Sequence, residues 1–546
     1  MEVTRRKQLG AFYTPPEVAR YLASWAIRSR MDRVLEPSCG EAEFLIAAAD
    51  RLKNAGGCLF NVPLSLTGVE INSTAAESAL KRLAAAGVDA DIHSGNFFEF
   101  PVERKFDAVV GNPPYIRYQQ FTGELRLSAI RSSLAAGVPL SGLASSWAAF
   151  VIHCTRMLAP TGRLGLVLPA ELLTVNYAEP IREFLLRRFS SIKLVTFQQR
   201  VFSNAQEEVV LLLAEGNGRT SHFKVYPANS ISCLSDLKQT EWRKFDAHGA
   251  KKWSSILVAP DQNNNYNEAI KRSGFCPLSD WGTTYLGAVT GNNKFFALRA
   301  DEVDALRLRP GDLRRISPPG SRHLRSHAFT TKAWQELAHS GARCYLFYPR
   351  ARLTKSSQRY IDHGEASGVH TAYKCSVREP WWIVPMVDTA QLFLTYMDAE
   401  RPRLVHNTAR VDHLNSLYGI RLHRRLARYA KCLPIASLNS LTTLGAELIG
   451  RSYGGGMLKM EPREADQLPM PPMELVRARL DRLMSIEPQV STLAAQGKLM
   501  DACAIVDKIL FLNESPLGKT DLDLIRSTRS FLRERRRARA GRNVKG

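Results

Sequence analysis

The regular alternation of strand-like and helix-like segments over residues 17–215 is the feature that most restricts the fold of this chain. Short apolar runs such as RVLEPS, LTGVEI and FDAVVG are separated by segments with helical spacing of apolar residues, such as EAEFLIAAADRLK and STAAESALKRLAAAG. We expect Ser73 or Thr74 to cap the second of these helices. Strands joined by helices pair in parallel, and the helices cover both faces of the sheet. The sequence therefore predicts a doubly wound α/β domain with its functional loops at the carboxyl ends of the strands.

The alternation ends near residue 220, which divides the chain into regions of different character. Residues 1–220 form the predicted α/β catalytic and cofactor-binding domain. Residues 221–473 are rich in turns, aromatic residues and arginines, which predicts a separate domain of mixed α+β structure. Residues 474–546 predict a basic helical segment that ends in RERRRARAGRNVKG.

Positive charge is concentrated in the second part of the sequence. The chain has 74 Lys and Arg against 52 Asp and Glu, a formal net charge of +22. Residues 1–220 contain 24 basic and 21 acidic residues, whereas residues 221–546 contain 50 and 31, a net charge of +19. This asymmetry predicts a polyanionic partner, and nucleic acid is the obvious one because each contacted phosphate releases a counterion.

The composition also argues against several classes of protein. Nine cysteines are scattered along the chain without a CxxC or a short Cys/His ladder, so we expect reduced thiols and no metal site. No apolar run approaches the roughly 18 residues of a membrane-spanning helix. The basic start of the sequence is not followed by the apolar stretch of a secretory signal, so we expect a cytoplasmic protein.

Two predicted strand ends carry residues suited to a nucleoside ligand. Gly40 follows the first strand and opens a helix, so backbone N–H groups can come close to a ligand there. Glu70 ends the next strand, where a carboxylate can accept both hydrogen bonds of a ribose diol. The second glycine of a dinucleotide fingerprint is absent, and Glu36 would repel a pyrophosphate. The pattern favours S-adenosylmethionine, whose ribose suits Glu70 and whose zwitterionic methionine suits Glu36 and the helix start.

The stretch VVGNPPYIRY places a polar amide, two prolines and an aromatic ring directly after a predicted strand. The prolines fix the backbone, so the carbonyl of Pro113 points in a set direction near the side-chain carbonyl of Asn112. Two acceptors at one point suit a planar NH2 group, because hydrogen-bonding both N–H bonds draws the nitrogen toward tetrahedral geometry and frees its lone pair. Tyr115 offers a flat face to the ring that carries the amine. We therefore expect attack by an exocyclic amine, without a general base of tuned pKa.

Together these motifs resemble those of amino-group DNA methyltransferases of the N6-adenine kind. The order GAFYTPPEVARYL, LEPSCGEAEF, GVEIN, GNFFEF and GNPPY, followed by a basic region, is similar to the gamma group, which includes the TaqI-type enzymes. The similarity covers residues 8–215 well and residues 280–473 more loosely. It implies a Rossmann-like, S-adenosylmethionine-dependent methyltransferase domain, a DNA-recognition domain, double-stranded DNA as the substrate, and a restriction-modification system with a separately encoded endonuclease.

Carried over residue by residue, the resemblance implies a cofactor site and a catalytic site. Thr14 would meet the methionine carboxylate, and Ile71 and Phe150 would enclose the adenine of the cofactor. Asn96 stands where the family usually has an aspartate that accepts from the adenine amine, so this contact would lose its charge. Phe202 would pack against the face of the target base opposite Tyr115. The remaining residues implied to bind the cofactor are Glu36, Cys39, Gly40, Glu70 and Phe97, and those implied to act in catalysis are Asn112, Pro113, Pro114 and Tyr115.

The resemblance also implies base flipping, because chemistry on an adenine inside a duplex is sterically blocked. The basic second domain would hold the duplex by its phosphates and read base edges. Arg401, Arg403, Lys294 and Asn292 lie in polar-aromatic loops that suit such contacts.

Several alternatives share part of this pattern. N4-cytosine DNA methyltransferases act on a similar amine but usually carry serine at the position of Asn112. Enzymes that methylate ribosomal RNA or a glutamine side chain use variants of the same tetrapeptide, but the motif before LEPSCG and the long basic domain argue against them. An inactive DNA-binding specificity protein is disfavoured by the intact residues 112–115, and we find no Asp…Glu-x-Lys cluster of a fused nuclease.

Overall fold

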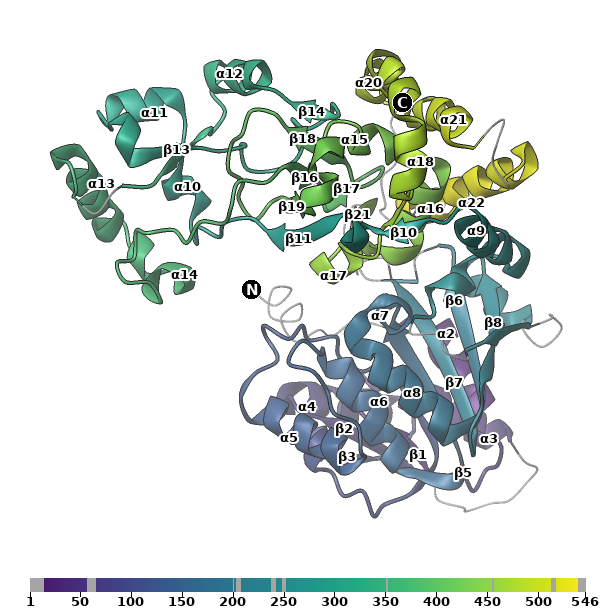
Figure 1. Cartoon of the computed structure of the whole chain (residues 1–546). Coiled ribbons are helices and arrows are strands. Elements are labelled where there is room, and N and C mark those ends of the chain that lie inside the picture. Colours follow the sequence, from purple (N-terminus) through teal and green to yellow (C-terminus); the bar gives the residue numbers. More distant parts are fainter. Residues whose placement is uncertain are drawn as a thin grey trace. The chain divides into compact units, whose positions relative to one another are not determined.

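The computed structural model divides the chain into two compact units (Figure 1). Unit 1 comprises Met1–Leu257 and Arg535–Gly546, and unit 2 comprises Val258–Glu534. Residues 10–13 of the first motif and residues 539–546 of the basic tail lie outside the described residues. The structure describes residues 14–55, 65–199, 201–202, 208–236, 242–247, 252–349, 352–453, 456–511 and 517–538.

Unit 1 is built around a nine-stranded sheet with the order β3-β2-β1-β4-β5-β7-β6-β8-β9. The strands β1 to β5 pair in parallel, and β7 lies antiparallel between β5 and β6. The strand order reverses between β1 and β4, and ligands of doubly wound sheets bind outside the strand carboxyl ends at such a point. The strands are β1 Val34–Glu36, β2 Leu66–Glu70, β3 Asp91–Ser94, β4 Phe106–Gly111, β5 Leu158–Pro169, β6 Phe189–Phe197, β7 Val209–Asn217, β8 His222–Ala228 and β9 Arg243–Asp246.

Helices cover both faces of this sheet, as the alternating pattern predicts. Figure 1 shows α6 and α8 in front of the strands and α2 and α3 behind them. The helix α2 starts at Pro16, which suits the first turn, and buries the apolar face Val18, Leu22 and Ala26. The helices of unit 1 are α2 Pro16–Ala26, α3 Glu43–Asn54, α4 Ser73–Ala85, α5 Gly123–Ala135, α6 Ser146–Arg156, α7 Glu171–Thr174 and α8 Glu179–Arg188, with short 3₁₀ turns η1 Phe97–Glu99, η2 Asn176–Ala178, η3 Ile231–Asp236 and η4 Ser254–Leu257.

Two details of unit 1 differ from the expectations. The cap of α4 is Asn72, whose side chain accepts a hydrogen bond from the Ala75 N–H at 3.2 Å, rather than Ser73 or Thr74. The sheet also continues past residue 220, because β8 pairs in parallel with β6 and β9 pairs with β8. The first unit therefore extends to Leu257. Alternation of strands with helices gave no signal for these two strands, since among the described residues only the short 3₁₀ turn η3 lies between them.

Unit 2 has a mixed α+β architecture with several small sheets. Its largest sheet has five strands in the order β11-β19-β16-β18-β14, and two three-stranded sheets have the orders β12-β15-β13 and β17-β21-β20. The strands are β10 Cys276–Pro277, β11 Gly282–Leu286, β12 Ala297–Leu298, β13 Leu313–Arg315, β14 Ala328–Phe329, β15 Tyr345–Phe347, β16 Leu392–Leu394, β17 Met397–Asp398, β18 Leu404–Asn407, β19 Tyr418–Leu422, β20 Arg451–Tyr453, β21 Met457–Lys459 and β22 Pro469–Met470.

Helices follow one another from Met473 onward, where the sequence predicts a helical segment, and the last of them continues past Glu534, the end of unit 2. Among the described residues, no helix combines the length and the apolar character needed to cross a bilayer. The helices are α9 Pro260–Arg272, α10 Asn293–Phe296, α11 Ala300–Ala305, α12 Thr331–His339, α13 Lys355–Ala366, α14 Tyr373–Ser376, α15 Leu433–Ala436, α16 Ser440–Ile449, α17 Pro462–Ala465, α18 Met473–Ala478, α19 Leu480–Ser485, α20 Glu487–Ala495, α21 Leu499–Leu510 and α22 Lys519–Ala538, with short 3₁₀ turns η5 Leu278–Asp280, η6 Pro310–Asp312, η7 Val369–Thr371 and η8 Arg424–Tyr429.

Several arginines of the basic helix α22 bind acceptors of unit 2. Arg533 forms a two-point ion pair with Glu400, and Arg529 donates to the Glu400 carbonyl at 3.0 Å. Arg526 pairs at 2.7 Å with Asp507, a carboxylate that is 0% exposed and also accepts from the N–H and the hydroxyl of Ser440. The cations of this part of α22 therefore dock the helix onto unit 2.

Replacement of Asp507 by alanine should destabilise unit 2 strongly, because it leaves the Arg526 guanidinium and the Ser440 N–H without their buried acceptor. We expect the free energy of unfolding to fall by about 3 kcal/mol, measured by urea unfolding. The control is Asp523→Ala, which removes the other carboxylate on Arg526 but one that is 54% exposed. A surface pair of this kind should change stability by less than about 1 kcal/mol, and equal effects of the two substitutions would contradict the role given to Asp507.

Candidate active site

The turn after β1 brings the ends of two neighbouring strands together. Gly40 and Ala42 both have left-handed backbone conformations, with φ of 47° and 61°. For alanine this conformation is strained, and such strain is concentrated at functional sites. The Gly40 N–H donates to Oε2 of Glu70 at 2.9 Å, and the Cys39 N–H donates to the Val69 carbonyl at 2.9 Å. Cys39 and Gly40 are therefore held against the end of β2, at Val69 and Glu70.

Glu70 orders the backbone on two sides of this turn. Its Oε1 accepts from the Asn72 N–H at 2.9 Å, at the start of α4, while its Oε2 holds Gly40. Each oxygen of a carboxylate has two acceptor positions, so both oxygens retain capacity for a further donor. Glu70 is half-buried, which leaves part of the carboxylate accessible.

Glu36, at the end of β1, is a buried carboxylate, with 2% of its surface exposed. Its Oε2 accepts from the Leu45 N–H at 3.2 Å. Burial raises the pKa of Glu36 well above its usual range, and the negative charge of nearby Glu70 raises it further. Within the part of the chain that the structure describes, neither Glu36 nor Glu70 forms an ion pair. Two such carboxylates favour a ligand that carries positive charge and disfavour one that carries phosphates.

Aromatic side chains lie beside this acidic site. Phe150 on α6 stacks on Phe97 with ring centroids 5.0 Å apart, and both rings are buried. No described acceptor takes up the Phe97 N–H, which leaves it available to a ligand. Ile71, just after β2, is 54% exposed. Asn96 caps the short turn η1, since its Oδ1 accepts from the Phe98 N–H and its Nδ2 donates to Glu99.

The corner after β4 joins the first motif of the chain. Asn112 donates through Nδ2 to the hydroxyl of Thr14 at 3.2 Å, across 98 residues of sequence. Its Oδ1 accepts from the Tyr115 hydroxyl at 2.7 Å, and the same hydroxyl lies 3.2 Å from the Val167 carbonyl at the end of β5. Among described residues nothing donates to the carbonyl of Pro113. The corner therefore presents two acceptors. The Pro113 carbonyl has no donor among the described residues, and Oδ1 of Asn112 accepts from the Tyr115 hydroxyl, whose O–H bond can rotate.

Ser146 at the start of α6 clamps the backbone on both sides of Tyr115. Its hydroxyl donates to the Pro114 carbonyl and accepts from the Ile116 N–H at 2.9 Å, and its own N–H donates to the Ile116 carbonyl at 3.0 Å. Ser146 is fully buried. Sequence reasoning did not find this residue, because a serine at a helix start is common and the contact joins segments 30 residues apart.

A second set of hydrogen bonds holds the start of α6 against the exit of β5. The Tyr177 hydroxyl donates to Glu171 just after β5, and it lies 3.1 Å from the Ser145 hydroxyl. Trp147 donates through Nε1 to the same Tyr177 hydroxyl at 3.2 Å. Because α6 also carries Phe150, one helix supports both the aromatic site and the corner at Asn112.

The two predicted aromatic partners of the target base are buried in this structure. Tyr115 is 6% exposed and Phe202 is 5% exposed, and both belong to the main hydrophobic cluster of unit 1. Stacking of these rings on a base stays a prediction.

The four residues of unit 2 that the sequence indicates as suited to DNA contacts differ in their burial and in their partners. Arg401 is 7% exposed, and Arg403 pairs with Asp398 at 2.7 Å, so these two arginines serve the interior of the unit. Asn292 caps α10 by accepting from the Phe295 N–H. Of the four residues, Lys294 is the one that is exposed. Arg401 is buried, so its guanidinium does not lie at a surface that a phosphate could reach.

Two family models match adjoining parts of the chain. The model described as N-6 DNA Methylase matches residues 2–269, and the model described as Type II methyltransferase M.Eco57I, C-terminal domain, matches residues 250–511. The chain is 21% identical to Type II methyltransferase M.AccI of Acinetobacter calcoaceticus, over 93% of this chain and 94% of that protein. It is 24% identical to Type II methyltransferase M.XamI of Xanthomonas campestris pv. amaranthicola, over 87% of each.

Solved structures show similarity of fold across both units. The cryo-EM structure of the DrdV-DNA complex aligns with 90% of this chain at a TM-score of 0.52 and 11% identity. This chain spans 58% of that larger protein. At this level of identity the comparison supports the order and type of the elements.

Replacement of Glu36 by glutamine should stabilise the protein in the absence of ligand. The folded-state pKa of Glu36 is raised above its unfolded value, so ionisation of this carboxyl opposes folding as the pH rises through the folded-state pKa. Glutamine keeps an acceptor for the Leu45 N–H without the charge. We expect the thermal midpoint of Glu36→Gln to exceed that of the parent protein at pH 8, with the difference shrinking toward pH 4.

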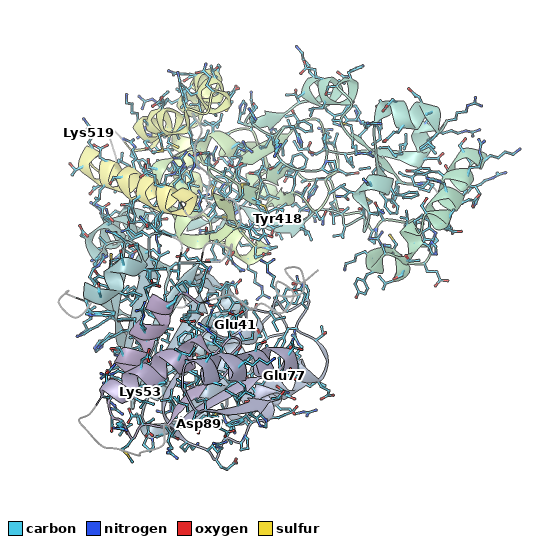
Figure 2. The ribbon with its side chains drawn as sticks, turned by 180° about the vertical axis from the view of Figure 1, so that it is seen from behind. Glu41, Lys53, Glu77, Asp89, Tyr418 and Lys519 are labelled. Atoms are coloured by element: carbon cyan, nitrogen blue, oxygen red, sulfur yellow. The ribbon has the colours of Figure 1, made fainter. Side chains whose placement is uncertain are left out.

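The matched control is Glu77→Gln, an exposed glutamate on α4 that Figure 2 labels. It should leave the thermal midpoint nearly unchanged at both pH values. A Glu36→Gln protein that is less stable than the parent at pH 8 would show that Glu36 has a compensating partner and would remove the case for a cationic ligand.

Proposed function

The chain belongs to the N-6 DNA methylase family and is an adenine-specific DNA methyltransferase of a restriction-modification system, and we propose that it methylates through the corner at residues 112–115. In this proposal the N6 amine of an adenine rotated out of duplex DNA binds between Asn112 and Pro113. The observation that supports it best is the pair of acceptors at the switch point of the sheet, next to the acidic site of Glu36 and Glu70.

Methyltransferases of this fold imply S-adenosylmethionine, and the residues present fit it. Glu36 and Glu70 form an acidic site without an ion-pair partner among the described residues, which suits a ligand with ammonium and sulfonium charges. We propose that Glu36 and the backbone at Cys39 and Gly40 hold the methionine part, and that Glu70 accepts from the ribose hydroxyls. When bound, the cofactor supplies a methyl group on positively charged sulfur. Thr14, Ile71, Asn96, Phe97 and Phe150 are proposed to complete this site.

Asn112 and Pro113 would activate the amine by accepting its two N–H bonds. The Tyr115 hydroxyl, which occupies Oδ1 of Asn112 at 2.7 Å, has the Val167 carbonyl as a second acceptor at 3.2 Å. A hydroxyl donates to one acceptor at a time, so Tyr115 can turn to Val167 when the amine takes its place. This exchange would avoid leaving a buried hydroxyl without a partner, which costs about 1–3 kcal/mol. After methylation the nitrogen would lose its proton to water.

Access of the adenine to this corner requires rotation out of the duplex, at a cost of a few kcal/mol. Stacking on Tyr115 and Phe202, at ~1–3 kcal/mol per base contact, would offset part of it. Unit 2 is proposed to hold the duplex, and the partner endonuclease of the restriction-modification system is proposed to be a separate chain. The alignment over 94% of a relative that is itself named a methyltransferase supports a separate endonuclease.

The reaction is tested by incubating the protein with labelled S-adenosylmethionine and plasmid DNA, then identifying the methylated nucleoside by mass spectrometry. We expect N6-methyladenine, and we expect Asn112→Ala to lower the turnover by about 100-fold or more, the scale seen when one preorganised hydrogen-bonding group is removed. Asn229→Ala, at an exposed position after β8, is the control and should retain activity. The detection of N4-methylcytosine would replace the proposed base, and an unchanged rate for Asn112→Ala would remove the corner from the mechanism.

Ser146→Ala should slow methyl transfer without weakening substrate binding. Loss of the hydroxyl frees the Pro114 carbonyl and the Ile116 N–H, so the corner would sample other positions. We expect the turnover number to fall about 10-fold, equivalent to about 1.4 kcal/mol, with the KM for DNA and for the cofactor nearly unchanged.

Ser133→Ala is the matched control, because Ser133 is equally buried but donates within its own helix, to Ala129 at 2.9 Å. Ser146→Thr retains the hydroxyl and should recover turnover. If Ser146→Ala raises both KM values and leaves the turnover number unchanged, Ser146 does not position the corner.

A further inference from the structure

One segment of unit 2 carries positive charge without any acidic residue. Between Asp412 and Glu447 the sequence contains four arginines and one lysine and no Asp or Glu. These five charges are half of the net charge of unit 2, which has 38 basic and 28 acidic residues over Val258–Glu534. Unit 1 has 36 basic and 24 acidic residues, so neither unit as a whole is distinguished by its charge. The local distribution is therefore more informative than the total.

Three of these cations, Arg424, Arg425 and Arg428, lie on a short turn whose apolar side chains are buried. In η8 (Arg424–Tyr429) the side chains of Leu426 and Tyr429 are 3% and 2% exposed. The Tyr429 ring meets the edge of the buried Trp281 ring at a centroid distance of 5.9 Å, and Trp281 donates to the Pro471 carbonyl at 3.0 Å. Residues three apart share a face of a 3₁₀ helix. The buried pair therefore defines one face, and Arg425 and Arg428 share another.

Four cations on and after this turn are exposed and have no acidic partner among the residues that the structure describes: Arg424, Arg425, Arg428 and Lys431. We call these four residues the basic turn. The preceding Arg421 is excluded because it pairs with Asp388. The Arg428 guanidinium lies over the Tyr429 ring, 5.0 Å from its centroid, which restricts its motion. Lys431 lies near enough to His327 and His406 for its charge to help lower the pKa of both rings, although burial is the main cause.

We propose that the basic turn binds the phosphates of the DNA substrate. This inference rests on the proposed function and names the surface through which unit 2 holds the duplex. Residues of a 3₁₀ helix rise about 2.0 Å each, so Arg424 and Arg428 are separated by about 8 Å along its axis. Phosphates of one DNA strand follow one another at about 3.4 Å along the duplex axis. The long side chains can therefore reach different phosphates, and an arginine can bind each phosphate in a bidentate manner.

Phosphate contacts position a protein on DNA without reading its sequence. The basic turn should thus contribute to affinity for any duplex and leave the preference for the recognition sequence unchanged. Because an acidic residue within the segment would repel a phosphate, the absence of Asp and Glu between residues 412 and 447 agrees with this role. An anchored turn also limits the loss of side-chain and backbone freedom on binding.

The test is the triple variant Arg424→Gln, Arg425→Gln, Arg428→Gln in the full chain. Its dissociation constant for a duplex of random sequence is measured between 50 and 300 mM salt. Each phosphate contact adds about 0.9 to the slope of log K against log salt concentration. We expect the slope to become shallower by up to about 2.7, with the KM for DNA raised and the turnover at saturating DNA retained.

The control variant Lys53→Gln, Lys332→Gln, Lys519→Gln removes the same charge from exposed lysines elsewhere, two of which Figure 2 labels. A uniform effect of net charge would change both triple variants alike, and that outcome would overturn the proposal. A basic-turn variant that binds random DNA normally but loses sequence preference would also overturn it, because the residues would then contact bases. Both variants should unfold at the parent temperature, since all six side chains are exposed.

The outcome is separable from that of the proposed function. If the parent protein fails to methylate adenine, the proposed function fails, yet the two salt slopes can still be compared. If the parent methylates DNA and the slope of the basic-turn variant equals that of the control, the reaction stands and the assigned surface is wrong.

Discussion

The reversal of strand order between β1 and β4 is the constraint on which the rest of unit 1 depends. Val34 of β1 pairs with Leu66 on one side and with Ala108 on the other, so the exits of three parallel strands open at the same edge. In doubly wound sheets the helices on the two sides of such a reversal cover opposite faces, and ligands bind at this point. The turn at Gly40, which contacts Glu70, and the corner at Asn112 are thereby brought to the same edge of the sheet. The proposed reaction depends on this proximity, because the methyl group would pass directly from the cofactor to the amine.

The buried carboxylate of Glu36, beside Glu70, lowers the stability of the folded protein when it is ionised. Glu36 is buried with one backbone donor and with Glu70 as a negative neighbour, so its ionised form is disfavoured in the free protein. A cationic ligand would relieve this, and binding free energy would then stabilise the folded protein. At the corner of Asn112 the Tyr115 hydroxyl lies within hydrogen-bonding distance of two acceptors. The Tyr115 hydroxyl donates to Asn112 and has the Val167 carbonyl as an alternative acceptor, so it would keep a partner if an amine took its place.

In unit 2 the surroundings of each arginine, rather than the number of arginines, decide which of them can bind a polyanion. Arg529 and Arg533 bind Glu400, Arg526 binds Asp507, and Arg401 is buried. These cations hold helices and loops in place, since a buried guanidinium must satisfy its donors within the protein. A surplus of positive charge becomes available to a polyanion only where acidic residues are missing nearby. The segment around η8 meets that condition, whereas the basic helix α22, which carries six arginines, uses several of its cations internally.

The sequence by itself determined the α/β class, the strands β1 to β7 and the strand-end motifs, because periodicity and turn residues are local properties of a chain. It also indicated the family through the order of those motifs, which the matching family models confirm. Only the tertiary structure decided that β8 and β9 extend the sheet, that Ser146 clamps the corner, and that Arg401 is buried while Arg424, Arg425 and Arg428 are exposed. These outcomes depend on contacts between segments distant in sequence. Burial and pairing of a charged side chain are set by its neighbours in space, and no local pattern of residues contains that information.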